Sequence, residues 1–204
     1  RGTYTRETIK YLRDCNRDFA SMIKWMDKER KSKNKTSLTN LDSMQFKSKI
    51  HMSGENASPL IYACSLKDFL TINQKNFDIV AITGNSMGWY TALTLAGVFT
   101  YKTGYHVIQT MGSMMRENII GGQIIYPIID EEWQIDNDIK DKVLSEIHSV
   151  NAYISISLGG YIVIGAEQKV LDKLLIKLPK IDQYPLQLPY HAAFHTPLLE
   201  SIST

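Results

Sequence analysis

The spacing of apolar side chains changes along the chain, and the change predicts two regions of different structure. In residues 5–28, apolar positions recur with near-helical periodicity among Arg, Asp and Lys, which predicts one long amphipathic helix. Residues 28–57 are polar and rich in Lys, Ser and Asn, and we expect a solvated loop there. A second helix is expected to begin at Ser58, a good N-cap, with Pro59 in its first turn.

A β-prone run precedes a glycine-rich turn in the middle of the chain. Residues 77–83 read Phe-Asp-Ile-Val-Ala-Ile-Thr, which predicts a buried parallel strand. A helix is predicted over residues 89–96, and a further one from 102 to about 117. Gly121 and Gly122 then interrupt the helical pattern, and strand-like segments follow them.

The remaining residues predict a β-α-β-β-α-β order, which is typical of a ferredoxin-like module. Leu158-Gly159-Gly160 supplies a hairpin turn between the two middle strands. The fold class that follows is α/β, with a larger body over residues 1–122, a small module over 123–189 and a return to the larger body at 190–204. The expected strands are 123–129, 152–157, 160–165 and 184–188, and the expected helices are 138–149 and 167–178.

The amino-acid composition is that of an ordinary folded protein, and its net charge argues against nucleic acid or an anionic membrane as a partner. Of the 204 residues, 44% are hydrophobic and 22% are charged, and the net charge of +2 is too weak to favour nucleic acid or an anionic membrane. No apolar run is long enough to cross a bilayer, and no signal peptide is visible. Cys15 and Cys64 lack metal-site or Cys-x-x-Cys spacing, which predicts reduced thiols and a cytoplasmic protein.

The first candidate for chemistry is Gly84-Asn85-Ser86-Met87-Gly88, a G-x-S-x-G sequence. Its expected place between a strand and a helix is the setting of a nucleophile elbow, in which a sharp turn presents the Ser hydroxyl to a cleft. The following helix directs its free N–H groups at a developing oxyanion, and the Met87 amide is the natural donor. The alternative is an ordinary turn in which Ser86 only caps the helix.

A nucleophilic Ser needs a base, and His is the usual one near neutral pH. His51 lies in the polar segment, and His106 and His148 fall in expected helices, where surface or packing roles are the simpler interpretation. His191 and His195 flank a small-residue segment directly after the ferredoxin-like module. Spacing alone does not choose between these two.

The serine turn, the inserted module and the segment Phe194-His195-Thr196-Pro197-Leu198 together resemble the malonyl-CoA:acyl carrier protein transacylase family. This family includes the acyltransferase domains of polyketide synthases, and the resemblance covers roughly residues 58–204. It implies an α/β-hydrolase-like large subdomain with a ferredoxin-like small one and an active site between them. It also implies that Ser86 is the nucleophile and His195 the base.

Several positions depart from the family pattern. Asn85 stands where the family usually has His, and Ser58 stands at a family Gln before Pro59. By the resemblance, a second oxyanion-hole amide comes from an N-terminal loop in which Arg1 occupies the place of a Gln. The Arg that pairs with the free carboxylate of malonyl groups is Met111 here, unless Arg116 substitutes through a shifted helix register.

The resemblance implies a serine-dependent acyltransferase with no bound metal or flavin. Its substrates are an acyl-CoA, from which the acyl group is taken, and the phosphopantetheine arm of an acyl carrier protein, which receives it. Two alternatives remain: a hydrolase that clears acyl groups from carrier proteins, and a non-catalytic carrier-protein docking domain. Family members continue beyond the catalytic His, so we expect either a longer natural chain or an impaired enzyme.

Overall fold

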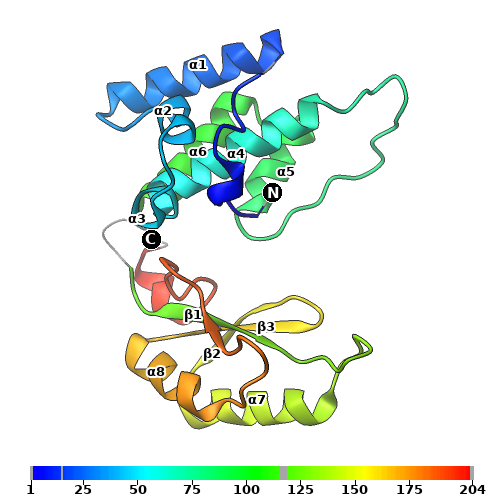
Figure 1. Cartoon of the computed structure of the whole chain (residues 1–204), viewed down its shortest axis with the longest axis vertical. Coiled ribbons are helices and arrows are strands. Elements are labelled where there is room, and N and C mark those ends of the chain that lie inside the picture. Colours follow the sequence, from blue (N-terminus) through cyan, green and yellow to red (C-terminus); the bar gives the residue numbers. More distant parts are fainter. Residues whose placement is uncertain (1, 15, 115–118, 203–204) are drawn as a thin grey trace. The chain divides into compact units, whose positions relative to one another are not determined.

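The computed structural model describes residues 2–14, 16–114 and 119–202. It divides the chain into two units, Arg1–Arg116 and Glu117–Thr204, and each unit has a hydrophobic core of its own. The first unit is helical, and the second combines helices with an antiparallel sheet, so the chain is a mixed α/β protein (Figure 1). In the described part of the chain, no helix combines the length and apolarity that a bilayer crossing requires.

The first unit is built around two long helices, α4 and α6, that pack against each other. Tyr62 and Leu60 of α4 and Ile108 of α6 are fully buried in its core. The elements of this unit are η1 (Arg6–Thr8), α1 (Arg17–Ser32), α2 (Leu38–Ser43), α3 (Ser48–His51), α4 (Gly54–Leu70), α5 (Gly88–Leu95) and α6 (Tyr101–Met114).

The single helix predicted over residues 5–28 is wrong in its first part. Residues Arg6–Thr8 form only a turn of 3-10 helix, and α1 begins at Arg17. The reason is Asn16, whose side chain accepts a hydrogen bond from the Phe19 backbone N–H at 2.9 Å. An Asn side chain in this position starts a helix rather than continuing one, because it satisfies a free N–H of the first turn.

The solvated loop predicted over residues 28–57 is also wrong. The segment contains the end of α1, all of α2 and α3 and the first turn of α4. Leu38, Leu41 and His51 are fully buried, and Arg30 is only 1% exposed. Most of the few apolar residues of this polar segment lie in the core or pack against it, which average composition does not reveal.

The helix expected to start at Ser58 starts four residues earlier, at Gly54, so Ser58 is not its N-cap. Pro59 therefore lies inside α4, where it has no N–H to donate to the carbonyl of Glu55, four residues before it. Arg30 Nη1 and Gln109 Nε2 each donate to that carbonyl oxygen at 3.0 Å. The bond that Pro59 removes is thus replaced from two other helices, which explains why the Arg30 guanidinium is buried.

The strand predicted over residues 77–83 does not form. The segment is extended and exposed, with Val80 94% and Phe77 64% accessible, and in Figure 1 it loops away from the helices between α4 and α5. A strand requires a neighbour for its backbone hydrogen bonds. The described residues of the first unit contain no other strand, so this β-prone run has nothing to pair with.

The two helices predicted after this run are confirmed within a residue at their starts, at Gly88 for α5 and Tyr101 for α6. Gly97 follows α5 with a φ of +78°, the left-handed conformation of a helix C-terminus. At the crossing of α6 with α4, a Cβ on Gly112 would come within 2.9 Å of Ser58 Oγ. Only a glycine at position 112 allows the two helices to approach this closely.

The second unit has the predicted β-α-β-β-α-β order, and its strands are arranged β2-β3-β1-β4. The strands β1, β3 and β2 pair antiparallel, and β4 pairs antiparallel with β1. The turn at Gly159 joins β2 and β3 as expected, with Leu158 N donating to Tyr161 O at 2.8 Å. The elements are β1 (Gly122–Pro127), α7 (Asn137–Ser149), β2 (Tyr153–Ser157), β3 (Tyr161–Ala166), α8 (Gln168–Lys177), β4 (Leu186–Gln187) and η2 (Pro197–Ile202).

Helices α7 and α8 cover one face of this sheet (Figure 1). Alternate residues of the strands, such as Ile124 and Ile164, point into the core beneath the helices. The residues between them, including Gln123 on β1 and Gly165 on β3, face the other way. The segment that carries His191 and His195 lies on that second face.

Candidate active site

Ser86 occupies a tight, strained turn. Its φ is +53°, a left-handed conformation that a residue with a side chain rarely adopts. The turn is closed by Gly88 N donating to Asn85 O at 2.8 Å and by Trp89 N donating to Ser86 O at 3.0 Å. A side chain on Gly84 would collide with the backbone of Gly88, so the turn requires glycine there. The sharp turn expected of a nucleophile elbow is therefore present and is followed by a helix, but the strand expected before it does not form.

The turn leads directly into the N-terminus of α5, which starts at Gly88 and runs for 8 residues. Met87 is the N-cap residue, and its side chain packs against the core of the first unit. The core thus anchors the residue that follows Ser86. The positive end of the helix dipole lies beside Ser86, where it would stabilise negative charge developing on a substrate oxygen.

Two further predicted site residues lie at the crossing of α4 and α6. Ser58 is half-buried within α4 and adjoins Gly112, the neighbour of Met111 in α6. The Met111 side chain is 38% exposed and so is not part of the helix's buried face. Arg1 and Arg116, which the sequence analysis assigns to the oxyanion hole and to substrate binding, lie outside the described residues.

His195 follows the segment Ala192–Phe194 in the second unit, and its φ is +56°. The side chain of His195 is exposed, whereas Ala192 and Ala193 are buried against the sheet. Ala193 N donates to Ile120 O at 2.9 Å and thereby ties the segment to the start of β1. His195 is therefore an exposed imidazole on a firmly packed backbone.

His191 has different surroundings, although it is also at the surface. Its Nδ1 lies 2.8 Å from Gln123 Oε1, and its ring packs edge-on against Phe194 at 5.7 Å between centroids. Since an amide oxygen only accepts hydrogen bonds, the Nδ1 atom carries the hydrogen. Partial shielding of this ring from water lowers the pKa of His191, because desolvation disfavours the charged form. His191 is thus held by the sheet.

Two residues that the sequence analysis does not single out organise this segment. Gln123 is 2% exposed, and its Nε2 donates to Ser155 Oγ at 2.6 Å. Ser155 Oγ in turn donates to the Phe194 carbonyl oxygen at 2.8 Å. The available signal was a Gln within an otherwise apolar strand, since a buried amide needs hydrogen-bonding partners.

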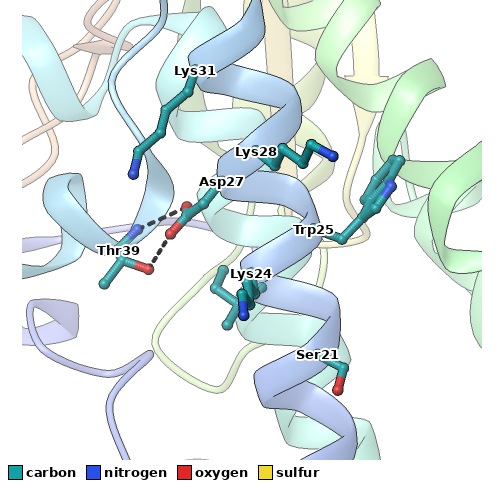
Figure 2. A pocket seen from close by; sticks show the side chains of 8 residues that line it. Ser21, Lys24, Trp25, Asp27, Lys28, Lys31 and Thr39 are labelled. Carbon is teal, nitrogen blue, oxygen red and sulfur yellow. Dashed lines mark hydrogen bonds between the residues drawn. The ribbon is translucent and has the colours of Figure 1, made fainter.

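A groove along α1 contains none of the predicted site residues. It has a volume of about 590 Å³. Within it, the Asp27 carboxylate accepts hydrogen bonds from the Thr39 backbone N–H at 3.2 Å and from the Thr39 hydroxyl (Figure 2). Within the described ranges, no three His, Cys, Asp or Glu side chains come together as metal ligands would. The groove is lined by Ser21, Ile23, Lys24, Trp25, Asp27, Lys28, Lys31 and Thr39.

No protein-family model matches the chain, and no curated protein matches it either. Several solved structures, in contrast, have a similar fold. The malonyl-CoA:acyl carrier protein transacylase of Burkholderia pseudomallei superposes with a TM-score of 0.74 at 17% identity, over 98% of this chain and 63% of that one. The acyltransferase domain of the polyketide synthase PpsC of Mycobacterium tuberculosis gives 0.69 at 20% identity, over 99% and 58%.

A third similar structure is a malonyl-transacylase in complex with its type II polyketide synthase acyl-carrier protein. It gives a TM-score of 0.63 at 16% identity and covers 88% of this chain and 58% of that one. The chain therefore has the fold of the malonyl-CoA:acyl carrier protein transacylases and of polyketide synthase acyltransferase domains. It spans 58–63% of the length of these three structures.

Proposed function

We propose that the chain carries the nucleophile and the base of a serine-dependent acyltransferase that loads an acyl carrier protein. The observation that carries this proposal is the strained Ser86 turn, with its φ of +53°, at the N-terminus of α5. A non-glycine residue in this conformation costs free energy. In the described part of the chain, seven non-glycine residues besides Ser86 and His195 also have a positive φ, so the assignment rests on the strain together with the place of Ser86 directly before a helix N-terminus. A shared fold with acyltransferases supports the same assignment.

In the first half of the proposed reaction, Ser86 is acylated. His195 takes the proton of the Ser86 hydroxyl as the oxygen attacks the thioester carbonyl of an acyl-CoA. The Met87 amide and the N-terminus of α5 stabilise the oxyanion, with a second amide supplied by the loop of Arg1. The CoA thiolate leaves and takes the proton from His195, so an acyl ester remains on Ser86.

In the second half, the acyl group moves to a carrier protein. The phosphopantetheine thiol gives its proton to His195 and attacks the ester carbonyl, and the Ser86 oxygen leaves and takes that proton back. The complex of a similar transacylase with its acyl-carrier protein supports this kind of partner. Asn85 and Met111 would line the acyl-binding side of the site, with Ser58 and Arg116 near it.

The proposed reaction implies a particular domain organisation. Residues 123–189 would be a ferredoxin-like small subdomain, and residues 1–122 part of a hydrolase-like large one. Residues 190–204 would lead back to the large subdomain. A cytoplasmic location belongs to the same proposal and rests on the spacing of the two cysteines.

Intact-protein mass spectrometry tests the proposal. The purified protein is incubated with acetyl-CoA, butyryl-CoA or malonyl-CoA, and then with a phosphopantetheinylated acyl carrier protein. We expect an acyl adduct on the wild type that is absent from Ser86→Ala and that passes to the carrier protein. Thr83→Ala, which removes a hydroxyl from the exposed segment just before the turn, is the matched control and should retain the adduct.

The other outcomes identify the alternatives. An adduct that decays to free acid faster than it reaches the carrier protein would mean that the protein is a hydrolase. A wild type that binds the carrier protein but forms no adduct with any acyl-CoA would mean a docking domain. An adduct that persists in Ser86→Ala would show that the nucleophile is another residue.

A further inference from the structure

A directional chain of hydrogen bonds connects the sheet of the second unit to the backbone that precedes His195. His191 Nδ1 donates to Gln123 Oε1 at 2.8 Å, and Gln123 Nε2 donates to Ser155 Oγ at 2.6 Å. Ser155 Oγ donates to the Phe194 carbonyl oxygen at 2.8 Å. Every donor in this chain meets an acceptor, so its direction is fixed from the imidazole of His191 to the carbonyl of Phe194.

The chain joins positions that are distant in sequence. Gln123 and His191 are 68 residues apart, and Ser155 and Phe194 are 39 apart. Gln123 lies on β1, one of the two inner strands, and Ser155 lies in the irregular step where the pairing of β2 with β3 shifts between Ile154 and Ile156. A β-bulge redirects a side chain relative to a regular strand, and here it brings the hydroxyl under the segment.

The sheet surface between these two residues is shaped to receive the segment. Gly165 of β3 pairs with both Gln123 and Tyr153, so it lies in the middle of this face. A Cβ at Gly165 would lie 2.6 Å from Thr196 Cγ2 and 3.7 Å from Ala193 Cα. The absence of a side chain thus lets the backbone around His195 lie directly on the strands, where Gln123 and Ser155 can reach it.

The peptide that receives the last hydrogen bond carries a strained residue. The Phe194 carbonyl belongs to the peptide that joins Phe194 to His195, and the φ of His195 is +56°. A left-handed conformation in a residue with a Cβ costs free energy and persists only where its surroundings hold it. Ser155 Oγ at 2.8 Å and Gln123 Nε2 at 3.5 Å both donate to this carbonyl oxygen, and together they orient the peptide plane that sets this angle.

We propose that Gln123 and Ser155 are positioning residues for His195: through the Phe194 carbonyl they hold the backbone conformation that aims the His195 imidazole. The proposal rests on the proposed function, in which His195 is the base. Neither residue is expected to touch the substrate, since both act beneath the segment from the strands. They are also absent from the motifs through which the chain resembles the transacylase family.

The test uses the removal of one hydroxyl. Ser155→Ala deletes the closer of the two donors to the Phe194 carbonyl oxygen, at 2.8 Å, and leaves the longer contact of 3.5 Å from Gln123 Nε2. It leaves no large cavity, and Ser155→Thr restores a hydroxyl at the same place. Ser157→Ala is the matched control, because Ser157 is an exposed residue of the same strand. Single-turnover acylation of Ser86 by a saturating acyl-CoA is measured for each variant, together with the half-saturating acyl-CoA concentration and the amide hydrogen exchange of residues 190–196.

We expect Ser155→Ala to slow acylation by about tenfold to 10²-fold, because a catalytic group displaced by about 1 Å can cost about 10² in rate. The half-saturating acyl-CoA concentration should stay within about twofold of the wild-type value, because substrate contacts are unchanged. Hydrogen exchange in residues 190–196 should accelerate in Ser155→Ala, while Ser155→Thr and Ser157→Ala behave as the wild type does. In a His195→Ala background, Ser155→Ala should have no further effect on acylation, since its action passes through His195.

Three results would overturn the proposal. The first is equal acylation rates in the wild type and Ser155→Ala, even if hydrogen exchange accelerates. The second is a tenfold loss that persists in the His195→Ala background, which would mean a general structural effect. The third is unchanged hydrogen exchange, which would mean that the peptide is held by other contacts. A wild type that forms no acyl adduct overturns the proposed function instead, and hydrogen exchange then still decides whether Ser155 holds the peptide.

Discussion

Ser86 and His195 have almost the same unusual backbone conformation, with φ angles of +53° and +56°. Both are non-glycine residues in the left-handed region, where the Cβ atom crowds the backbone. Each is followed closely by a residue that packs firmly, Met87 in the first unit and Thr196 in the second. The two residues proposed to perform the chemistry therefore both carry local strain that their surroundings must hold.

The strain at Ser86 allows a prediction that separates chemistry from stability. Ser86→Ala and Ser86→Gly should both abolish the acyl adduct, because neither retains a nucleophile. Ser86→Gly should be more stable than Ser86→Ala by about 1 kcal/mol, because glycine adopts a positive φ without steric cost. Urea denaturation of the two variants measures the difference. Equal stabilities would mean that the turn relaxes when the hydroxyl is removed.

The two histidines of the segment should differ strongly when each is replaced. His195→Ala should slow acylation by about 10² to 10⁴, the usual loss for a general base. His191→Ala should slow it by less than about tenfold, because it only removes the first donor of the chain that ends at Phe194. Single-turnover acylation rates provide the comparison. Similar losses in both variants would show that the base is not His195 alone.

Asp42 should make the stability of the first unit depend on pH. It is 1% exposed, accepts hydrogen bonds from the Tyr4 hydroxyl at 2.7 Å and from Leu12 N at 3.1 Å, and burial raises its pKa. A pKa raised in the folded state means that the protonated form is favoured by folding. The stabilisation is complete below the unfolded-state pKa and is lost as the pH rises through the folded-state pKa.

Asp42→Asn removes this dependence on pH. The Asn side-chain oxygen can still accept a hydrogen bond from Leu12 N, and the Asn side-chain nitrogen can donate one to the Tyr4 hydroxyl oxygen. The stability of the variant relative to the wild type should therefore increase between about pH 3 and about pH 7. Urea denaturation at several pH values measures it, and Asp141→Asn, on the surface of α7, is the control. A difference that stays constant over this range would mean that Asp42 titrates equally in the folded and unfolded states.

The second unit is predictable from its sequence because its elements are determined locally. Short, nearly continuous apolar runs define β1 and β3, and Gly159 fixes the turn before β3, so the observed ends lie within about two residues of the expected ones. The series of hydrogen bonds from Gln123 through Ser155 to Phe194 was not predicted. Gln123 and Ser155 are separated by 32 positions in the sequence, and Ser155 and Phe194 by 39. No local pattern encodes a contact of that kind.

The first unit is less predictable because long-range partners decide its structure. Arg30 looks like a solvated residue in a run of charges, yet it is buried where it replaces the hydrogen bond that Pro59 removes from Glu55. Residues 77–83 have the composition of a strand, yet a strand also needs a neighbour. The turn at Ser86 and the helix after it were predicted from the glycine and serine spacing, but the strand that was part of the same argument does not form.

Selectivity for the acyl group should depend on Met111. A malonyl group carries a carboxylate, and burying that charge without a partner is costly, whereas an arginine would pair with it through two charge-assisted hydrogen bonds. Met111 offers only a flexible apolar surface, which suits a methyl or alkyl end. We therefore expect the wild type to prefer acetyl-CoA or a longer neutral acyl-CoA to malonyl-CoA.

Met111→Arg should shift the ratio of kcat/KM for malonyl-CoA over acetyl-CoA by at least about tenfold, equivalent to about 1.4 kcal/mol. The substitution should not disturb the core, because the Met111 side chain is already 38% exposed on α6. Thr110→Arg places the same charge on an exposed neighbouring position of the helix and is the matched control. An equal shift in both variants would indicate a general attraction of anions rather than a specific carboxylate site. A wild-type preference for malonyl-CoA would mean that another cation, such as Arg116, binds the carboxylate, and that Met111 does not occupy the position of the family arginine.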